Sequence, residues 1–128
     1  MKAILIAATA AVSIAAASAQ AADFSPAELC KATISVEMGR KTKSMKTVNA
    51  DPPEISYKRP DGDSFKYRCK IDGDQVVWRT FLTDTREWGR WRENYAAGDA
   101  MTTYSIDGGN LKITNDQANP ASFKKSDF

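Results

Sequence analysis

Carboxylates are the main side chains of this sequence that could catalyse a reaction, because the 128-residue chain contains no histidine. The lack of histidine removes the commonest general base, the Ser-His triads and most zinc sites. A pair of catalytic acids would need rigid placement at a defined separation, and the best candidates are Glu87 and Glu93, on either side of Trp91. Acidic side chains are mostly exposed, so we expect both to be surface charges and expect no enzyme activity.

Two Asp-Gly-Asp segments resemble the start of a calcium-binding loop. The segments at residues 61–63 and 72–74 are not followed by the ligand spacing and the terminal glutamate of an EF-hand. Asp-Gly is also a strong signal for a tight hairpin turn, and we interpret both segments as turns. We expect no metal site and no cofactor.

Basic and aromatic residues alternate with apolar ones along residues 64–82, SFKYRCKIDGDQVVWRTFL. The pattern predicts a β-hairpin that turns at Asp72-Gly73 and places Ile71 opposite Asp74. Side chains alternate between the two faces of a strand, so one face is apolar and packs on the core. The other face, called the outward face below, carries Lys66, Arg68, Lys70, Val77, Arg79 and Phe81.

The outward face is expected to continue onto a fourth strand within residues 87–95. A register that places Phe81 opposite Trp88 also places Arg79 opposite Arg90, and like charges across a strand pair repel each other. An acidic protein surface or an anionic ligand would relieve this repulsion through ion pairs and would stack on the aromatic rings. The candidate binding residues are therefore Lys66, Arg68, Arg79, Phe81, Trp88 and Arg90.

The alternative for this face is a solvated surface without a ligand. Its charges would then be balanced by Glu54, Glu87 or Glu93, since surface charges usually are solvated. Two further tryptophans, Trp78 and Trp91, are expected to belong to the core.

The N-terminus has the pattern of a secretory signal peptide over residues 1–19. Lys2 precedes an apolar run that is too short to favour a membrane span, and Ala17-Ser18-Ala19 is a small-residue cleavage site. The mature protein is therefore expected to be periplasmic or secreted, with cleavage near Ala19. In such an oxidising compartment the only two cysteines, Cys30 and Cys69, are expected to form a disulfide.

Local signals place the elements that must position these residues. Ser25-Pro26-Ala27-Glu28 is a capping box with proline at the first helical position, and it predicts a helix over residues 26–38. Gly39 is the expected C-cap. The apolar stripe of this helix contains Cys30, so a disulfide to the hairpin would join the helix to the inward face of the sheet.

Further turn signals predict two more hairpins and two irregular segments. Pro60-Asp61-Gly62 fits a hairpin loop that pairs Tyr57 with Phe65, and the Gly-Gly turn of residues 101–114 joins the last two strands. Residues 40–51 contain four basic residues without a strong period, and we expect an exposed linker or mobile loop there. From residue 115 onward we expect a poorly ordered tail, anchored by Phe123.

Together these signals predict a single α+β domain over residues 20–114, in which an N-terminal helix packs on a curved antiparallel meander of about six strands. The alternative is a small closed β-barrel with a flanking helix. The near balance of 18 basic and 16 acidic residues predicts no general attraction to nucleic acid.

The functional hypothesis is an exported, non-enzymatic binding protein, either an inhibitor or an immunity-type partner, that uses the outward face. The alternative hypothesis is a small-ligand or glycan-binding module. Its pocket would lie between the helix and the sheet, near Trp78 and Trp91.

Overall fold

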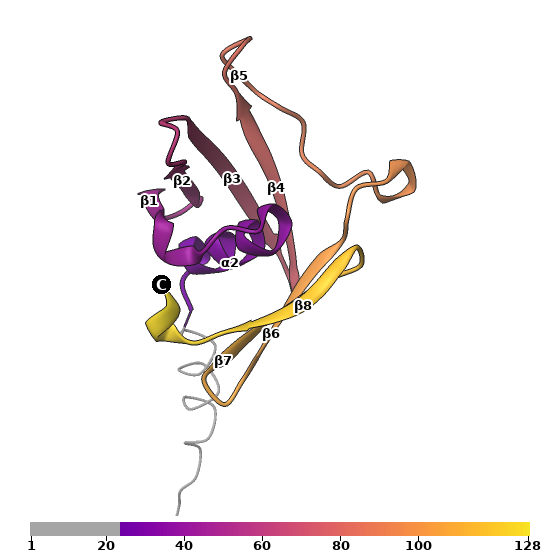
Figure 1. Ribbon diagram of the computed structural model, residues 1–128. Coiled ribbons are helices and arrows are strands. Elements are labelled where there is room, and N and C mark those ends of the chain that lie inside the picture. The colour runs from indigo at the N-terminus through magenta and orange to yellow at the C-terminus, as the bar shows by residue number, and fades with distance from the viewer. Residues whose placement is uncertain (1–23) are drawn as a thin grey trace, which may run out of the picture.

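The computed structural model describes residues 24–128, so the predicted signal peptide lies outside the described residues. One helix, α2 (Pro26–Met38), lies across a curled antiparallel sheet (Figure 1). The sheet order is β1-β2-β3-β4-β6-β7-β8, and β5 pairs with β4 beside this path. The strands are β1 (Met45–Asn49), β2 (Glu54–Lys58), β3 (Ser64–Asp72), β4 (Gln75–Leu82), β5 (Glu87–Trp88), β6 (Thr102–Asp107), β7 (Asn110–Asn115) and β8 (Ala118–Phe123).

This architecture confirms the α+β fold with a curved antiparallel meander. The sheet has eight strands, more than the sequence predicts. β1 and β8 are the ends of the pairing path, so the sheet is an open half-barrel and the closed-barrel alternative is wrong. The helix lies across the opening of this half-barrel (Figure 1). Within residues 24–128, no helix is long and apolar enough to cross a membrane.

The boundaries of α2 follow from its local sequence, as predicted. The hydroxyl of Ser25 accepts a hydrogen bond from the backbone N–H of Glu28, and Glu28 in turn accepts one from the backbone N–H of Ser25. This capping box satisfies donors that the first turn leaves free. Gly39 ends the helix with φ of 66°, a left-handed conformation that suits glycine because it has no Cβ.

The predicted disulfide joins α2 to β3. Cys30 and Cys69 are bonded, with their Cα atoms 5.7 Å apart, and both are almost fully buried. The bond lies in an apolar cluster that includes Ile34 and Trp78, beneath β1–β4. A second cluster, around Leu29 and beneath β6–β8, uses a different part of the same helix. One helix therefore contributes to the core beneath both halves of the sheet.

The hairpins form where the turn signals predict them, but one register differs. The β2–β3 pairing places Tyr57 opposite Phe65, as expected. In the β3–β4 pairing Ile71 lies opposite Val76, not opposite Asp74, because Gly73 takes the first of the two loop positions, with φ of 62°. The partner of each β3 residue is shifted by two positions along β4, so every side chain of the hairpin stays on its predicted face.

Residues 40–51 do not form the predicted linker. A short 3₁₀ turn, Thr42–Ser44, leads into β1, which pairs with β2 at the edge of the sheet. Met45 is the only buried residue of this strand. The segment therefore has no apolar period to recognise, and its strand conformation depends on backbone pairing with β2.

The expectation of a poorly ordered tail is likewise wrong. Residues 118–123 form β8, which pairs with β7 and places Phe123 opposite Leu111. Phe123 is buried, as predicted for an anchor. The chain then reaches the β1 side of the molecule (Figure 1), where the hydroxyl of Thr42 donates a 2.6 Å hydrogen bond to the carbonyl of Asp127. This strand also has too few inward side chains to produce a visible alternation.

Candidate functional site

Five of the six candidate binding residues lie together on the outward face. β3 supplies Lys66 and Arg68, β4 supplies Arg79 and Phe81, and Trp88 comes from β5, where it pairs with Phe81 as predicted. The side chains that alternate with them near the middle of both strands are buried in the core. The two faces of the hairpin therefore have separate environments, as a period of two predicts.

The outward face is a stack of cations on aromatic rings. The stack includes Trp91, which the sequence assigns to the core. The distances from the cationic group to the ring centre are 4.4 Å for Lys66 on Phe81, 4.1 Å for Arg68 on Trp88, 4.4 Å for Arg79 on Trp91 and 4.8 Å for Lys70 on Trp91. Each such contact contributes about 0.5–1 kcal/mol at a partly exposed position. The stack therefore favours these positions of the cationic groups.

The like-charge pair on this face differs from the predicted one. Arg79 lies directly opposite Arg68 in the β3–β4 register, and the prediction that it lies opposite Arg90 is wrong. The ring of Trp88 contacts both guanidinium groups, at 4.1 Å from Arg68 and 5.6 Å from Arg79. A shared ring partly offsets the repulsion between two cations.

Two of the four stacked cations also have a carboxylate partner. Nε of Arg68 is 2.8 Å from Oε1 of Glu54, whose side chain is 12% exposed. Nζ of Lys70 is 3.2 Å from Oε1 of Glu93. The solvated-face alternative expects nearby carboxylates to neutralise the cations in this way, and two of the four stacked cations are neutralised so.

Arg79 differs from these two residues. No carboxylate among residues 24–128 lies within ion-pair distance of it. Its Nε is buried and has no hydrogen-bond acceptor among the described residues, a deficit of about 1–3 kcal/mol for a buried donor. The side chain as a whole is still partly exposed. Arg79 is thus a partly exposed cation, stacked on Trp91, without a carboxylate partner in the part of the chain that the structure describes.

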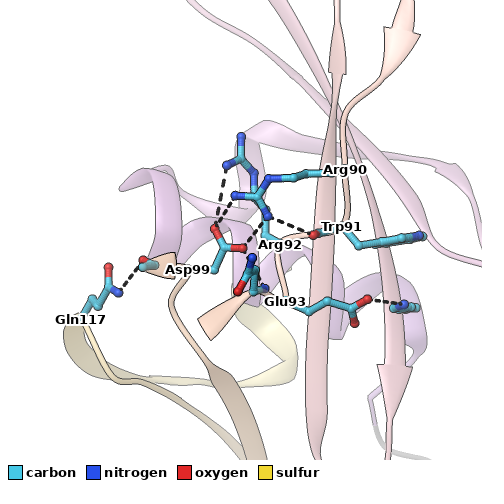
Figure 2. A network of polar contacts seen from close by, with 9 residues as sticks. Arg90, Trp91, Arg92, Glu93, Asp99 and Gln117 are labelled. Carbon is cyan, nitrogen blue, oxygen red and sulfur yellow. Dashed lines mark hydrogen bonds and ion pairs between the residues drawn. The ribbon is translucent and has the colours of Figure 1, made fainter. Parts of the chain in front are cut away.

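Arg90 lies outside the stack, contrary to the prediction. Its two Nη atoms contact the carboxylate of Asp99 at 2.6 and 3.0 Å, and the backbone N–H of Asn94 donates to the same carboxylate at 2.9 Å (Figure 2). The hydrogen bonds from Arg90 lower the pKa of Asp99 below its ordinary value. Arg90 therefore fixes the segment that follows β5 and is not available to a ligand in the predicted way.

The predicted fourth strand is only two residues long, because its register with β4 changes after Gly89. The N–H of Gly89 donates to the carbonyl of Thr80, and the N–H of Arg92 donates to the carbonyl of Trp78, both at 2.8 Å. Three steps along this segment therefore match two steps along β4, as in a β-bulge, and a one-residue change reverses the side-chain directions. Trp91 is consequently placed on the outward face.

A hollow of about 520 Å³ opens beside Trp91. Val48, which lines it, is 52% exposed. The sequence predicts nothing here, because Val48 lies in the supposed linker and no local signal reveals the register change that exposes Trp91. The charged side chains that line the hollow are Glu54, Arg68 and Arg79, and its apolar residues include Val48, Pro52 and Trp91.

The pocket expected between helix and sheet lacks the residues assigned to it. Trp78 is 9% exposed and belongs to the apolar cluster beneath α2. Trp91 contacts Lys70 and Arg79 on the opposite side of the sheet. The small-ligand hypothesis therefore loses the pair of tryptophans on which it was based.

The acidic residues considered for catalysis or metal binding have structural surroundings. Glu87 is exposed on β5, and Glu93 is exposed and paired with Lys70. Asp61 accepts a hydrogen bond from the side chain of Arg59 and one from the N–H of Asp63, so it stabilises the β2–β3 turn. In the part of the chain that the structure describes, no group of three or more His, Cys, Asp or Glu residues could hold a metal ion.

Comparison with known proteins identifies no relative. No protein-family model matches the chain, and no curated protein or solved structure matches it significantly.

Proposed function

We propose that this chain is an exported, non-enzymatic binding protein, an inhibitor or immunity-type partner, that captures an acidic protein on its outward face. The observation that carries the proposal is Arg79, a cation fixed on Trp91 without a carboxylate partner among the described residues. A partner that contributes a carboxylate would supply the missing counter-charge.

The composition of the face supports a protein partner. Arginine and tryptophan are the residues that most often dominate the binding energy of protein interfaces. Mutual stacking already restricts their positions, so binding would cost less side-chain entropy than for unrestrained side chains. Lys66, within the stack, and Lys58, on the same face of the neighbouring strand β2, add positive charge. Neither has an ion-pair partner among the described residues. An acidic surface would therefore be both attracted and oriented by this face.

Export is supported by two observations of different kinds. The disulfide between Cys30 and Cys69 is of the sort that persists in oxidising compartments. The pattern of residues 1–19 is typical of a secretory signal peptide.

The test compares the purified protein with two charge-reversed variants as immobilised baits. The bait variant Lys58→Glu with Lys66→Glu reverses two outward charges without breaking an ion pair between described residues. The control variant, Lys112→Glu with Lys124→Glu, makes the same change in net charge at exposed positions elsewhere. All three baits are exposed to the extracytoplasmic protein fraction of the source cells.

The expected result is an acidic protein that the wild-type and control baits retain and the outward-face variant releases. Thermal unfolding should show that all three baits are folded. Retention of the same proteins by all three baits, or by none, would contradict the proposal.

A further inference from the structure

We infer that the hollow beside Trp91 is a binding site for a single carboxylate attached to an apolar group. The hollow is part of the outward face, so this inference rests on the proposed function and specifies the chemical group that the face recognises. Arg79 is the ion-pair partner of the carboxylate, and Trp91 and Val48 cover its apolar part. Such a group could be a free carboxylic acid or the end of a partner's chain.

The charges that line the hollow favour one anion. Two arginines and one glutamate line it. Glu54 is nearly buried and its Oε1 lies 2.8 Å from Nε of Arg68, so these two charges neutralise each other. Arg79 is the charge that remains. A single carboxylate would therefore make the occupied hollow neutral, whereas a dianion would leave an unpaired charge close to Glu54.

The apolar part of the hollow favours a ligand with an apolar body. Val48 is 52% exposed at the rim, and the ring of Trp91 lies 4.4 Å from the guanidinium carbon of Arg79. A carboxylate that approaches Arg79 would bring whatever it is attached to against Trp91, Val48 and Pro52. Bare acetate or phosphate would leave this apolar surface in water, and a hydrocarbon group would cover it.

The hollow is also built from parts of the chain that are far apart. Val48 belongs to β1, Glu54 to β2, Arg68 to β3 and Arg79 to β4, and Trp91 follows β5. The position of Trp91 is fixed in turn by the contacts of Arg90 and Asp99 (Figure 2). The side chains that would contact the carboxylate group are thus held in place before a ligand arrives, which lowers the entropic cost of binding.

The experiment titrates the intact, disulfide-bonded protein with phenylacetate and follows the indole N–H signal of Trp91 by NMR. Phenylacetamide is the matched neutral probe, and acetate is the probe without an apolar group. We expect saturable binding of phenylacetate, at least tenfold weaker binding of each of the other two, and at least tenfold weaker phenylacetate binding to Arg79→Gln. Equal binding of acid and amide would overturn the inference.

Two variants at Val48 keep the test valid if Arg79→Gln does not fold. Val48→Glu places a carboxylate at the rim, where it should repel the probe and weaken binding at least tenfold. Val48→Gln has the same size without the charge and should weaken binding only a few-fold. Similar phenylacetate affinities for the Glu and Gln variants would count against an anion site.

A second pair of probes distinguishes the source of the carboxylate. A short acetylated peptide that ends in phenylalanine is compared with its C-terminally amidated form. Tighter binding of the free-acid peptide than of phenylacetate assigns the site to a chain end, and the reverse order assigns it to a free acid. If phenylacetate binds but protein capture ignores Lys58 and Lys66, the proposed function fails alone. If capture depends on them and no acid binds, this inference fails alone.

Discussion

Removing the disulfide should destabilise the fold strongly, and the structure permits an estimate of the effect. The perturbation is the double substitution Cys30→Ala with Cys69→Ala, which avoids placing hydroxyl groups in the core. The two cysteines are 39 residues apart in sequence. In the loop-entropy model, opening a loop of this length lowers the free energy of unfolding by about 4 kcal/mol. Both side chains are almost fully buried, so a small cavity adds to this loss.

The assay is chemical and thermal unfolding followed by far-ultraviolet circular dichroism. For a domain of this size, 1 kcal/mol corresponds to a shift of about 4–8 °C in Tm, so the expected fall in Tm is roughly 15–30 °C. Reduced wild-type protein is the matched control, because it lacks the cross-link but retains both sulfur atoms. Its deficit should account for most of that of the double variant, and reductant should not affect the double variant at all.

The reasoning would be refuted by a loss of less than about 1 kcal/mol in both the reduced protein and the double variant, since the loop-entropy model predicts several times more. Such a result would mean that the apolar clusters around α2 hold the helix on the sheet without the covalent link. A large loss in the double variant but not on reduction would assign the effect to the cavity instead of the cross-link.

Two carboxylates should make opposite contributions to the pH dependence of stability, measured by urea unfolding near neutral pH and near pH 3. Hydrogen bonds from Arg90 lower the pKa of Asp99, so the contribution of Asp99 to stability is lost as pH falls through that lowered pKa. Asp99→Asn should therefore be less stable than the wild type at neutral pH, and the difference in the free energy of unfolding should shrink in acid. Burial is the main cause of the raised pKa of Glu37, although the side chain of Asn115 donates a 2.6 Å hydrogen bond to this carboxylate. The contribution of Glu37 to wild-type stability should therefore be lost as pH rises from its ordinary pKa to the raised one. Glu37→Gln should not show this loss. A difference from wild type that is the same at both pH values would contradict either expectation.

Features that depend on local signals could be predicted from the amino-acid sequence. The capping box and Gly39 place the ends of α2, because each satisfies backbone groups within a few residues of itself. The period of two assigns Lys66 and Arg68 to one face and Cys69 to the other, and this assignment survives the two-residue change in the β3–β4 register. The disulfide follows from there being only two cysteines.

The edges of the sheet and the final shape of the outward face depend on long-range pairing and could not be predicted. β1 has a single buried side chain, Met45, so no pattern marks it, and backbone pairing with β2 makes it a strand. The position of Trp91 depends on one extra residue after Gly89 and on the pairing of Arg90 with Asp99. A one-residue change in register leaves the amino-acid pattern unaltered yet reverses every side chain beyond it. This is the physical reason why the sequence indicates which residues form the cationic face, whereas the hollow beside it is visible only in the folded chain.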